Sequence, residues 1–116
     1  MAHSPSISGA FCPNGNTVTF LANTAAPTAV QAPATNVLQS FCQYRVYNSG
    51  SGIAFMGVGS NTINANTNAV VVSTNGNSIP VMPGSVEILT FPTNSYFTAI
   101  TSSGTSQVYV TPGLGV

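Results

Sequence analysis

The chain has 116 residues and contains one arginine, one glutamate and one histidine, with no lysine and no aspartate. Charged side chains make up 2% of the residues, against roughly a quarter in an ordinary soluble domain, and the formal net charge is zero. Because clusters of lysine and arginine bind phosphate groups and anionic lipid headgroups, this composition argues against nucleic acid and membranes as partners.

Neutral polar residues take the place of the missing charges. The chain has 14 Ser, 14 Thr and 12 Asn, while its hydrophobic fraction of 43% is close to the usual share. Disorder is typical of low hydrophobicity combined with high net charge, and neither is present, so we expect one folded domain with a single core. Because proteins without net charge tend to associate, we also expect this domain to work inside an assembly.

Residues 1–36 are expected to form an extended N-terminal arm with one strand. This segment contains four of the eight prolines, and the only run in it that is typical of a strand lies at 17–22. Such an arm could wrap over a neighbouring subunit; the alternative is a frayed terminus followed by ordinary loops. The first residues have neither the basic nor the apolar region of a secretory signal.

Residues 37–116 are expected to form the main domain, because strand-favouring residues dominate there and helix-favouring residues are scarce. Turn-forming segments separate the predicted strands, which lie at 37–47, 53–59, 69–73, 85–91, 96–101 and 106–111. The last two strands are predicted to form a hairpin whose alternating positions are Phe97, Ala99, Val108 and Val110. Short strands at this spacing predict an all-β fold, a single-domain β-sandwich or jelly roll with short strands and the extended N-terminal arm.

The two oppositely charged side chains lie in two of the predicted strands. Arg45 and Glu87 are each the other's only possible strong partner, which makes them a candidate cross-strand ion pair. The alternative is that both are separately exposed at the rims of the sheets, because exposed ion pairs contribute little to stability.

The residues needed for catalysis or metal binding are almost absent. One carboxylate cannot form the pair that general acid–base hydrolysis uses, and His3 has no aspartate to orient it for a catalytic triad. The usual metal ligands, which here are His3, Cys12, Cys42 and Glu87, do not follow any zinc-site spacing. We therefore expect a protein that is not an enzyme and that has no catalytic residue, no metal and no cofactor.

The two cysteines, Cys12 and Cys42, are expected to be reduced and buried. A chain without an export signal favours free thiols, and a single disulfide between the two is the alternative.

Aromatic side chains are the candidates for an interface with another protein, since tyrosine in particular is enriched at such surfaces. The candidates are Phe11, Phe20, Tyr44, Tyr47, Tyr96 and Tyr109. The tyrosines, together with the many Asn and Thr side chains, could alternatively bind a glycan through ring stacking and hydrogen bonds, or could simply close the edge of the core.

The second part of the chain combines three recognisable segments. Residues 44–59 have a strand, an Asn-Ser-Gly turn and a strand; residues 80–91 have a Pro-Gly-Ser turn before a strand; residues 96–116 have a closing hairpin that ends in Thr-Pro-Gly. In this pattern, residues 44–116 resemble small structural proteins of tailed bacteriophages. The first 43 residues carry none of the pattern.

The resemblance implies a virion component, and in particular a head decoration or cement protein of β-sandwich or jelly-roll form. Such a protein is made in the host cytoplasm, sits on the capsid surface and stabilises the head by binding the major capsid protein and its own copies, as a homo-dimer or homo-trimer. Three alternatives remain open at this point: a tail or fibre module that binds host glycan, an accessory protein of the head–tail connector, and an adhesive or surface-coat protein unrelated to phage.

Overall fold

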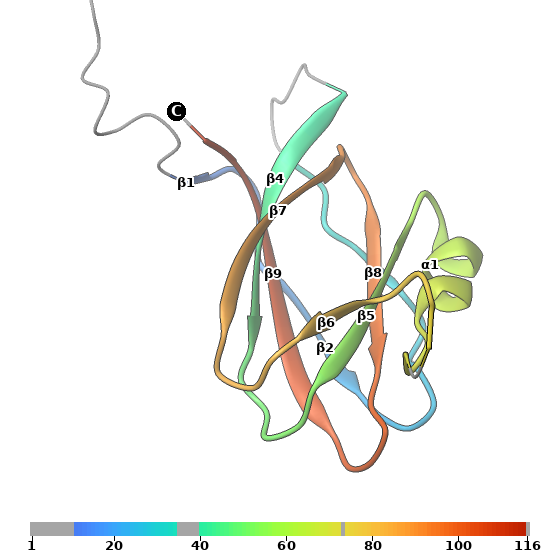
Figure 1. Cartoon of the computed structure of the whole chain (residues 1–116). Coiled ribbons are helices and arrows are strands. Elements are labelled where there is room, and N and C mark those ends of the chain that lie inside the picture. Colours follow the sequence, from blue (N-terminus) through green and yellow to red (C-terminus); the bar gives the residue numbers. More distant parts are fainter. Residues whose placement is uncertain (1–10, 35–39, 73, 116) are drawn as a thin grey trace, which may run out of the picture.

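The strands of the protein form two antiparallel sheets that pack face to face, as a computed structural model shows (Figure 1). The structure describes residues 11–34, 40–72 and 74–115. In chain order the elements are β1 (Phe11–Pro13), β2 (Val18–Ala22), β3 (Val30–Gln31), β4 (Phe41–Asn48), β5 (Ala54–Gly59), α1 (Thr62–Asn68), β6 (Ile79–Val81), β7 (Val86–Pro92), β8 (Tyr96–Ile100) and β9 (Ser106–Gly115).

The strand pairing identifies the sandwich as a jelly roll. Strands pair from the two ends of the series inward, as β2 with β9, β3 with β8, β4 with β7 and β5 with β6. Pairing of β4 with β9 and of β5 with β8 completes the order β2-β9-β4-β7 in one sheet, here sheet A, and β3-β8-β5-β6 in the other, here sheet B. β1 also pairs with β9 and is the fifth strand of sheet A. This is a long hairpin of four strand pairs rolled over itself, which is the jelly-roll arrangement. The predicted all-β, single-domain sandwich is confirmed.

The core lies between the two sheets and is built from alternating strand positions. Phe97 and Ala99 from β8 meet Val108 and Val110 from β9 there, and all four side chains are fully buried. The alternation predicted for these four positions is therefore confirmed. Tyr44 from β4 lies beside them, with its ring centroid 4.8 Å from that of Phe97.

The predicted hairpin of 96–101 and 106–111 is wrong. β8 pairs with β3 and β5 in sheet B, whereas β9 pairs with β1, β2 and β4 in sheet A. The segment between them crosses from one sheet to the other, and its turn is closed by a 2.7 Å hydrogen bond from the Thr101 hydroxyl to the Gly104 carbonyl. Two strands with alternating apolar residues and a turn between them can form a hairpin within one sheet, or can belong to different sheets. Only the strands with which each one pairs distinguish the two arrangements.

The extended arm with one strand is also wrong for the part of residues 1–36 that the structure describes. Residues 11–34 contribute three strands, and these belong to both sheets. β9 is ten residues long, so one of its edges accepts β2 at Ser106–Val110 and β1 at Gly113–Gly115. The arm expected at 1–10 lies outside the described residues, as do 35–36 and the first residues of the strand predicted from 37.

The strand predicted at 69–73 is wrong for residues 69–72, which have no regular structure, and a short helix, α1, comes directly before them. The Asn61 side chain caps α1 by accepting a 2.8 Å hydrogen bond from the Asn64 amide. The helix packs on the outer face of β5, where Gly57 and Gly59 have no side chains; a Cβ built on Gly59 lies 2.5 Å from the Ala65 nitrogen. Packing on β5 therefore stabilises this helix more than the intrinsic helix propensity of its residues does. β6 was likewise not predicted.

Candidate functional site

The outer face of sheet A carries several of the exposed apolar side chains. The strand register places Tyr47 beside both Tyr109 and Val86, and Arg45 beside both Thr111 and Ile88. Five of the nine large hydrophobic side chains that are exposed among the described residues lie on β2, β4, β7 and β9: Leu21, Phe41, Val86, Ile88 and Tyr109. On the opposite side of the molecule, α1 packs on sheet B (Figure 1).

Arg45 and two tyrosines form a depression at the centre of this outer face. The depression has a volume of about 410 Å³ and is lined by Thr17, Arg45, Tyr47, Ser49, Tyr109 and Thr111. The two tyrosine rings are stacked, with centroids 6.2 Å apart and planes 21° from parallel. The Thr17 and Thr111 hydroxyls share a 2.7 Å hydrogen bond beside them. The depression thus offers aromatic faces, hydroxyls and one guanidinium group.

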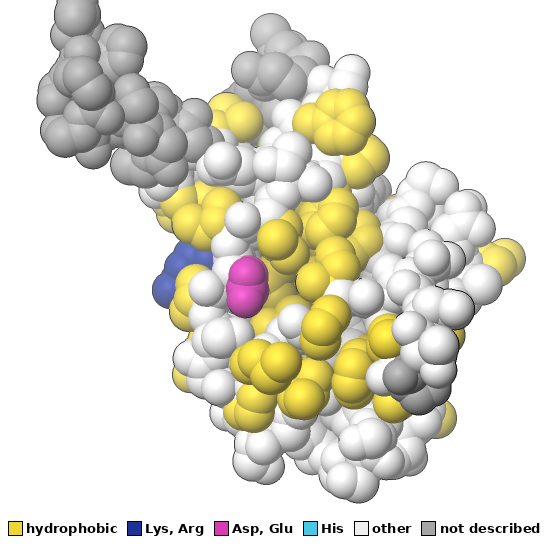
Figure 2. Space-filling model, in the orientation of Figure 1, with side chains coloured by type: hydrophobic (Ala, Val, Ile, Leu, Met, Phe, Trp, Pro, Cys, Tyr) yellow, Lys and Arg dark blue, Asp and Glu magenta, His cyan; other side chains and the backbone are white. Residues whose placement is uncertain are grey.

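A second apolar surface lies where β6 and β7 are the edge strands of the two sheets. We call this side of the sandwich the β6/β7 rim. Hydrophobic side chains collect on it around the magenta glutamate in Figure 2. A cleft of about 280 Å³ opens there, with Val58, Ile79 and Phe91 among its lining residues, and Met82 nearby in the chain is 49% exposed.

The predicted ion pair between Arg45 and Glu87 is not formed. Arg45 is opposite Ile88 in the register of β4 and β7, whereas Glu87 is opposite the buried Val46. Since adjacent residues of a strand point to opposite faces, Arg45 projects from the outer face and Glu87 projects toward the β6/β7 rim. Both side chains are exposed, which is the alternative that the sequence left open.

The six aromatic candidates for an interface divide into three groups. Phe20 and Tyr44 are core residues with 5% and 0% exposure, so they are wrong as interface candidates. Tyr47 and Tyr109 lie on the outer face of sheet A, and Phe11 lines an adjoining depression that also includes Arg45. Tyr96 is on β8 in sheet B, partly buried beside Gly59.

Val86 and Ile88 complete the outer face, and sequence reasoning did not select them. Their alternation with Glu87 is visible in the sequence, but alternation does not tell which face of a strand is covered. Val86 and Ile88 lie on the same exposed face as Arg45 and Tyr109, and β7 pairs only with β4, so no strand flanks them on the other side.

Tyr44 holds the turn between β7 and β8 from inside the core. Its hydroxyl donates a 3.0 Å hydrogen bond to the Pro92 carbonyl and accepts one of 3.3 Å from the Ser95 amide. Burial, with a further contribution from the Cys42 side chain, raises the pKa of Tyr44 from 10.0 to about 12. The hydroxyl is therefore neutral at ordinary pH and has a structural role.

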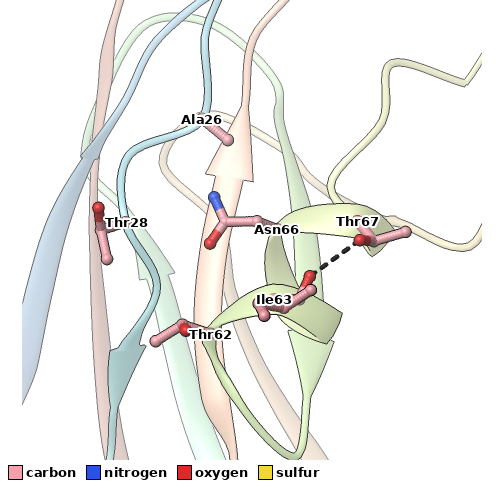
Figure 3. A pocket seen from close by; sticks show the side chains of 6 residues that line it. All are labelled: Ala26, Thr28, Thr62, Ile63, Asn66 and Thr67. Carbon is pink, nitrogen blue, oxygen red and sulfur yellow. Dashed lines mark hydrogen bonds between the residues drawn. The ribbon is translucent and has the colours of Figure 1, made fainter.

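A third depression lies beside α1 and is lined mainly by small polar side chains (Figure 3). Asn66, which lines it, donates a 2.8 Å hydrogen bond to the Pro27 carbonyl and accepts one of 3.1 Å from the Ala29 amide. Its amide is thus engaged in fixing the loop between β2 and β3 to the helix, and it offers little to a ligand.

The cysteines are both free in the described structure, with Cys42 buried in the core and Cys12 exposed on β1. The expectation that both are buried is therefore wrong for Cys12. Within residues 11–34, 40–72 and 74–115, no three His, Cys, Asp or Glu side chains come together as a possible metal site. Over the same residues, no helix has the length and apolar character needed to cross a bilayer.

Comparison of the chain with protein-family models, with curated proteins and with solved structures found no match.

Proposed function

We propose that this protein is a non-enzymatic structural protein of a virion, a capsid decoration or cement protein that stabilises a phage head by binding the major capsid protein. The observation that carries the proposal is the nearly uncharged surface with large apolar side chains on the outer face of sheet A. Phe41 and Ile88, for example, are 56% and 47% exposed. Exposed apolar patches of this kind mark surfaces that another protein covers.

The neutral composition suits a protein that is covered on assembly. Burying an ion costs several kcal/mol unless it is paired, whereas hydroxyl and amide groups are buried at little cost when they find hydrogen-bond partners. Apart from Arg45 and Glu87, the described surface carries no charged side chain that an interface must desolvate. The jelly roll agrees with this role, since it recurs in viral capsid domains, although lectins also use it.

The proposed mechanism is thermodynamic. Copies that bind the assembled shell but not its free subunits add interface free energy only to the shell, and mass action then shifts the equilibrium toward the intact particle. The protein would be made in the host cytoplasm and would act at the capsid surface, with no catalytic residue, cofactor or nucleic acid involved.

The test compares otherwise identical particles with and without this protein. We expect particles that carry it to withstand a higher temperature before releasing their genome, and purified protein added back to bare particles to restore that temperature. Quantitative mass spectrometry should find hundreds of copies per particle. Equal thermal stability with and without the protein would refute the proposal.

A second candidate is a tail or fibre module that binds host glycan, and the depression lined by Arg45, Tyr47 and Tyr109 favours it. Tyrosine rings stack on sugar faces, and hydroxyls and guanidinium groups bind sugar oxygens. Copy number separates the candidates, since a handful of copies per virion fits a tail module or a head–tail connector accessory and not a decoration protein. Loss of glycan binding in Tyr109→Ala would support the glycan-binding candidate.

A further inference from the structure

The side chains of Arg45 and Glu87 both lack a partner within residues 11–34, 40–72 and 74–115. They are the only arginine and the only glutamate, and the chain has no lysine or aspartate. Neither side chain forms an ion pair or hydrogen bond with another of the described residues, and both side chains are exposed. A second copy of this chain offers each of them its missing counter-charge.

The apolar surroundings of both groups make such a contact favourable. Glu87 lies on the β6/β7 rim among hydrophobic side chains (Figure 2), and Arg45 lies between Ile88 and Thr111 on the outer face of sheet A. The Coulomb attraction within a charge pair is stronger under apolar contacts than at an open surface, and it offsets the cost of removing both ions from water. Either group covered by an uncharged partner would instead lose its hydration without compensation.

We propose that copies of this protein associate head to tail, with the β6/β7 rim of one copy docked on the outer face of sheet A of the next, so that Glu87 pairs with Arg45. The two side chains leave the sheet on opposite faces. A two-fold contact centred on Arg45 brings Arg45 toward Arg45, and a head-to-tail contact avoids this repulsion. A head-to-tail contact places each Arg45 against the Glu87 of the neighbouring copy, except at the ends of an open chain.

Repetition of this contact generates a ring where the rotation between neighbours closes, or an open filament where it does not. The contact occupies part of the outer face of sheet A, which also carries the proposed function. It is a contact between copies of the chain and is measured on purified protein without capsids, so either proposal can fail while the other holds.

Charge reversal tests the pairing directly. In Arg45→Glu and in Glu87→Arg, like charges face each other across the contact, and we expect self-association measured by sedimentation velocity to weaken by about tenfold or more. The double variant Arg45→Glu/Glu87→Arg restores opposite charges and should recover most of the wild-type association.

Mixing the two single variants tests whether the pair forms between chains. Each variant alone should remain largely monomeric. In an equimolar mixture, however, the carboxylate introduced by Arg45→Glu in one chain meets the guanidinium introduced by Glu87→Arg in another. We therefore expect the mixture to associate. Recovery only after mixing, together with unchanged circular dichroism and thermal unfolding of each variant, excludes a folding defect as the cause.

Thr67 on the exposed side of α1 provides charge controls away from both surfaces. Thr67→Glu and Thr67→Lys alter the net charge by one unit each and should leave self-association unchanged. Wild-type protein that stays monomeric at high concentration would overturn the inference. So would an oligomer unaffected by both reversals, or one not rescued by the double variant. An Arg45 site that binds acidic sugars on monomeric protein would also overturn it, and would support glycan binding instead.

Discussion

The Tyr44 hydroxyl, from the middle of sheet A, donates a 3.0 Å hydrogen bond to the carbonyl oxygen of Pro92 at the end of β7. The same hydroxyl accepts a hydrogen bond from the Ser95 amide, so one buried side chain holds both sides of the turn that leads from sheet A to sheet B. The ring of Tyr44 packs on Phe97 of the opposite sheet. The sequence suggested an interface role for this tyrosine, and the structure gives it the central place in the core.

Removing this hydroxyl should destabilise the fold without changing its shape. In Tyr44→Phe the ring remains but the Ser95 amide loses its acceptor, and we expect the free energy of unfolding to fall by about 1 kcal/mol. Chemical denaturation measures the loss. Tyr109→Phe is the matched control, since Tyr109 lies on the surface and its change should stay within about 0.5 kcal/mol. Equal losses in the two variants would contradict the assigned role.

Stability should decrease at alkaline pH because of the same side chain. The folded-state pKa of Tyr44 is about 12, above its ordinary value of 10.0, so the unfolded chain loses this proton first as the pH rises. The contribution of Tyr44 to stability is therefore complete below pH 10 and is lost progressively toward pH 12. Unfolding measured across this range should show a smaller decrease for Tyr44→Phe than for the wild type. If the free energy of unfolding changes with pH in the same way for both proteins, Tyr44 has the same pKa in the folded and the unfolded chain.

The close contact of α1 with β5 depends on the absence of a side chain at Gly57. A Cβ at this position meets the Ala65 carbonyl oxygen, so we expect Gly57→Ala to cost about 1–3 kcal/mol and to increase hydrogen exchange in α1. Gly104 is the contrasting case: it has open space around it but a φ of 71°, which asparagine tolerates. Gly104→Asn should therefore cost much less. The reverse order of the two losses would show that helix packing does not require Gly57.

Asn48 is buried and joins three backbone segments. Its amide nitrogen donates to the carbonyls of Gly52 and Val81, each at 2.9 Å, and its oxygen accepts from the Gly50 amide. Asn48→Asp keeps the shape but sets a carboxylate against two carbonyl oxygens, so we expect a loss of at least about 2 kcal/mol. Ser49→Ala, at the neighbouring exposed position, should change little. A stable Asn48→Asp variant at neutral pH would argue against this network.

The two cysteines should differ in reactivity. Cys12 is exposed and Cys42 is buried, so a thiol reagent should modify one cysteine per folded chain and both after denaturation. The Cys12→Ser variant should lose the reaction of the folded protein and keep the one seen on unfolding. Two reactive thiols in the folded wild type would show that the core around Cys42 opens readily.

The fold class follows from local pattern, whereas the sheet partners do not. Phe97, Ala99, Val108 and Val110 alternate along their strands, and their burial is predictable because strand side chains alternate between two faces. That β8 and β9 belong to different sheets is not predictable in this way, because the turn at 102–105 fits either connection. The pairing of β9 with β4 is decided between segments more than fifty residues apart.

The candidate site shows the same division. The composition identified Arg45 and Glu87 as the residues to examine, since no other arginine or glutamate exists in the chain. The sequence could not tell whether these two side chains share a face of the sheet, because the answer depends on the register of β4 and β7. A shift of one residue in that register moves the two side chains from opposite faces to the same face.

The sequence by itself determined that this protein is a neutral all-β domain whose residues leave almost no acid–base chemistry available, because these properties depend only on residue types and local alternation. Tertiary structure alone decided that the sandwich is a jelly roll, that α1 forms over Gly57, and that Val86 and Ile88 face outward. The physical reason is that burial is a relation between segments. A strand at the edge of a sheet and a strand at its centre can have the same alternation, and only the neighbours that pack against them distinguish the covered face from the exposed one.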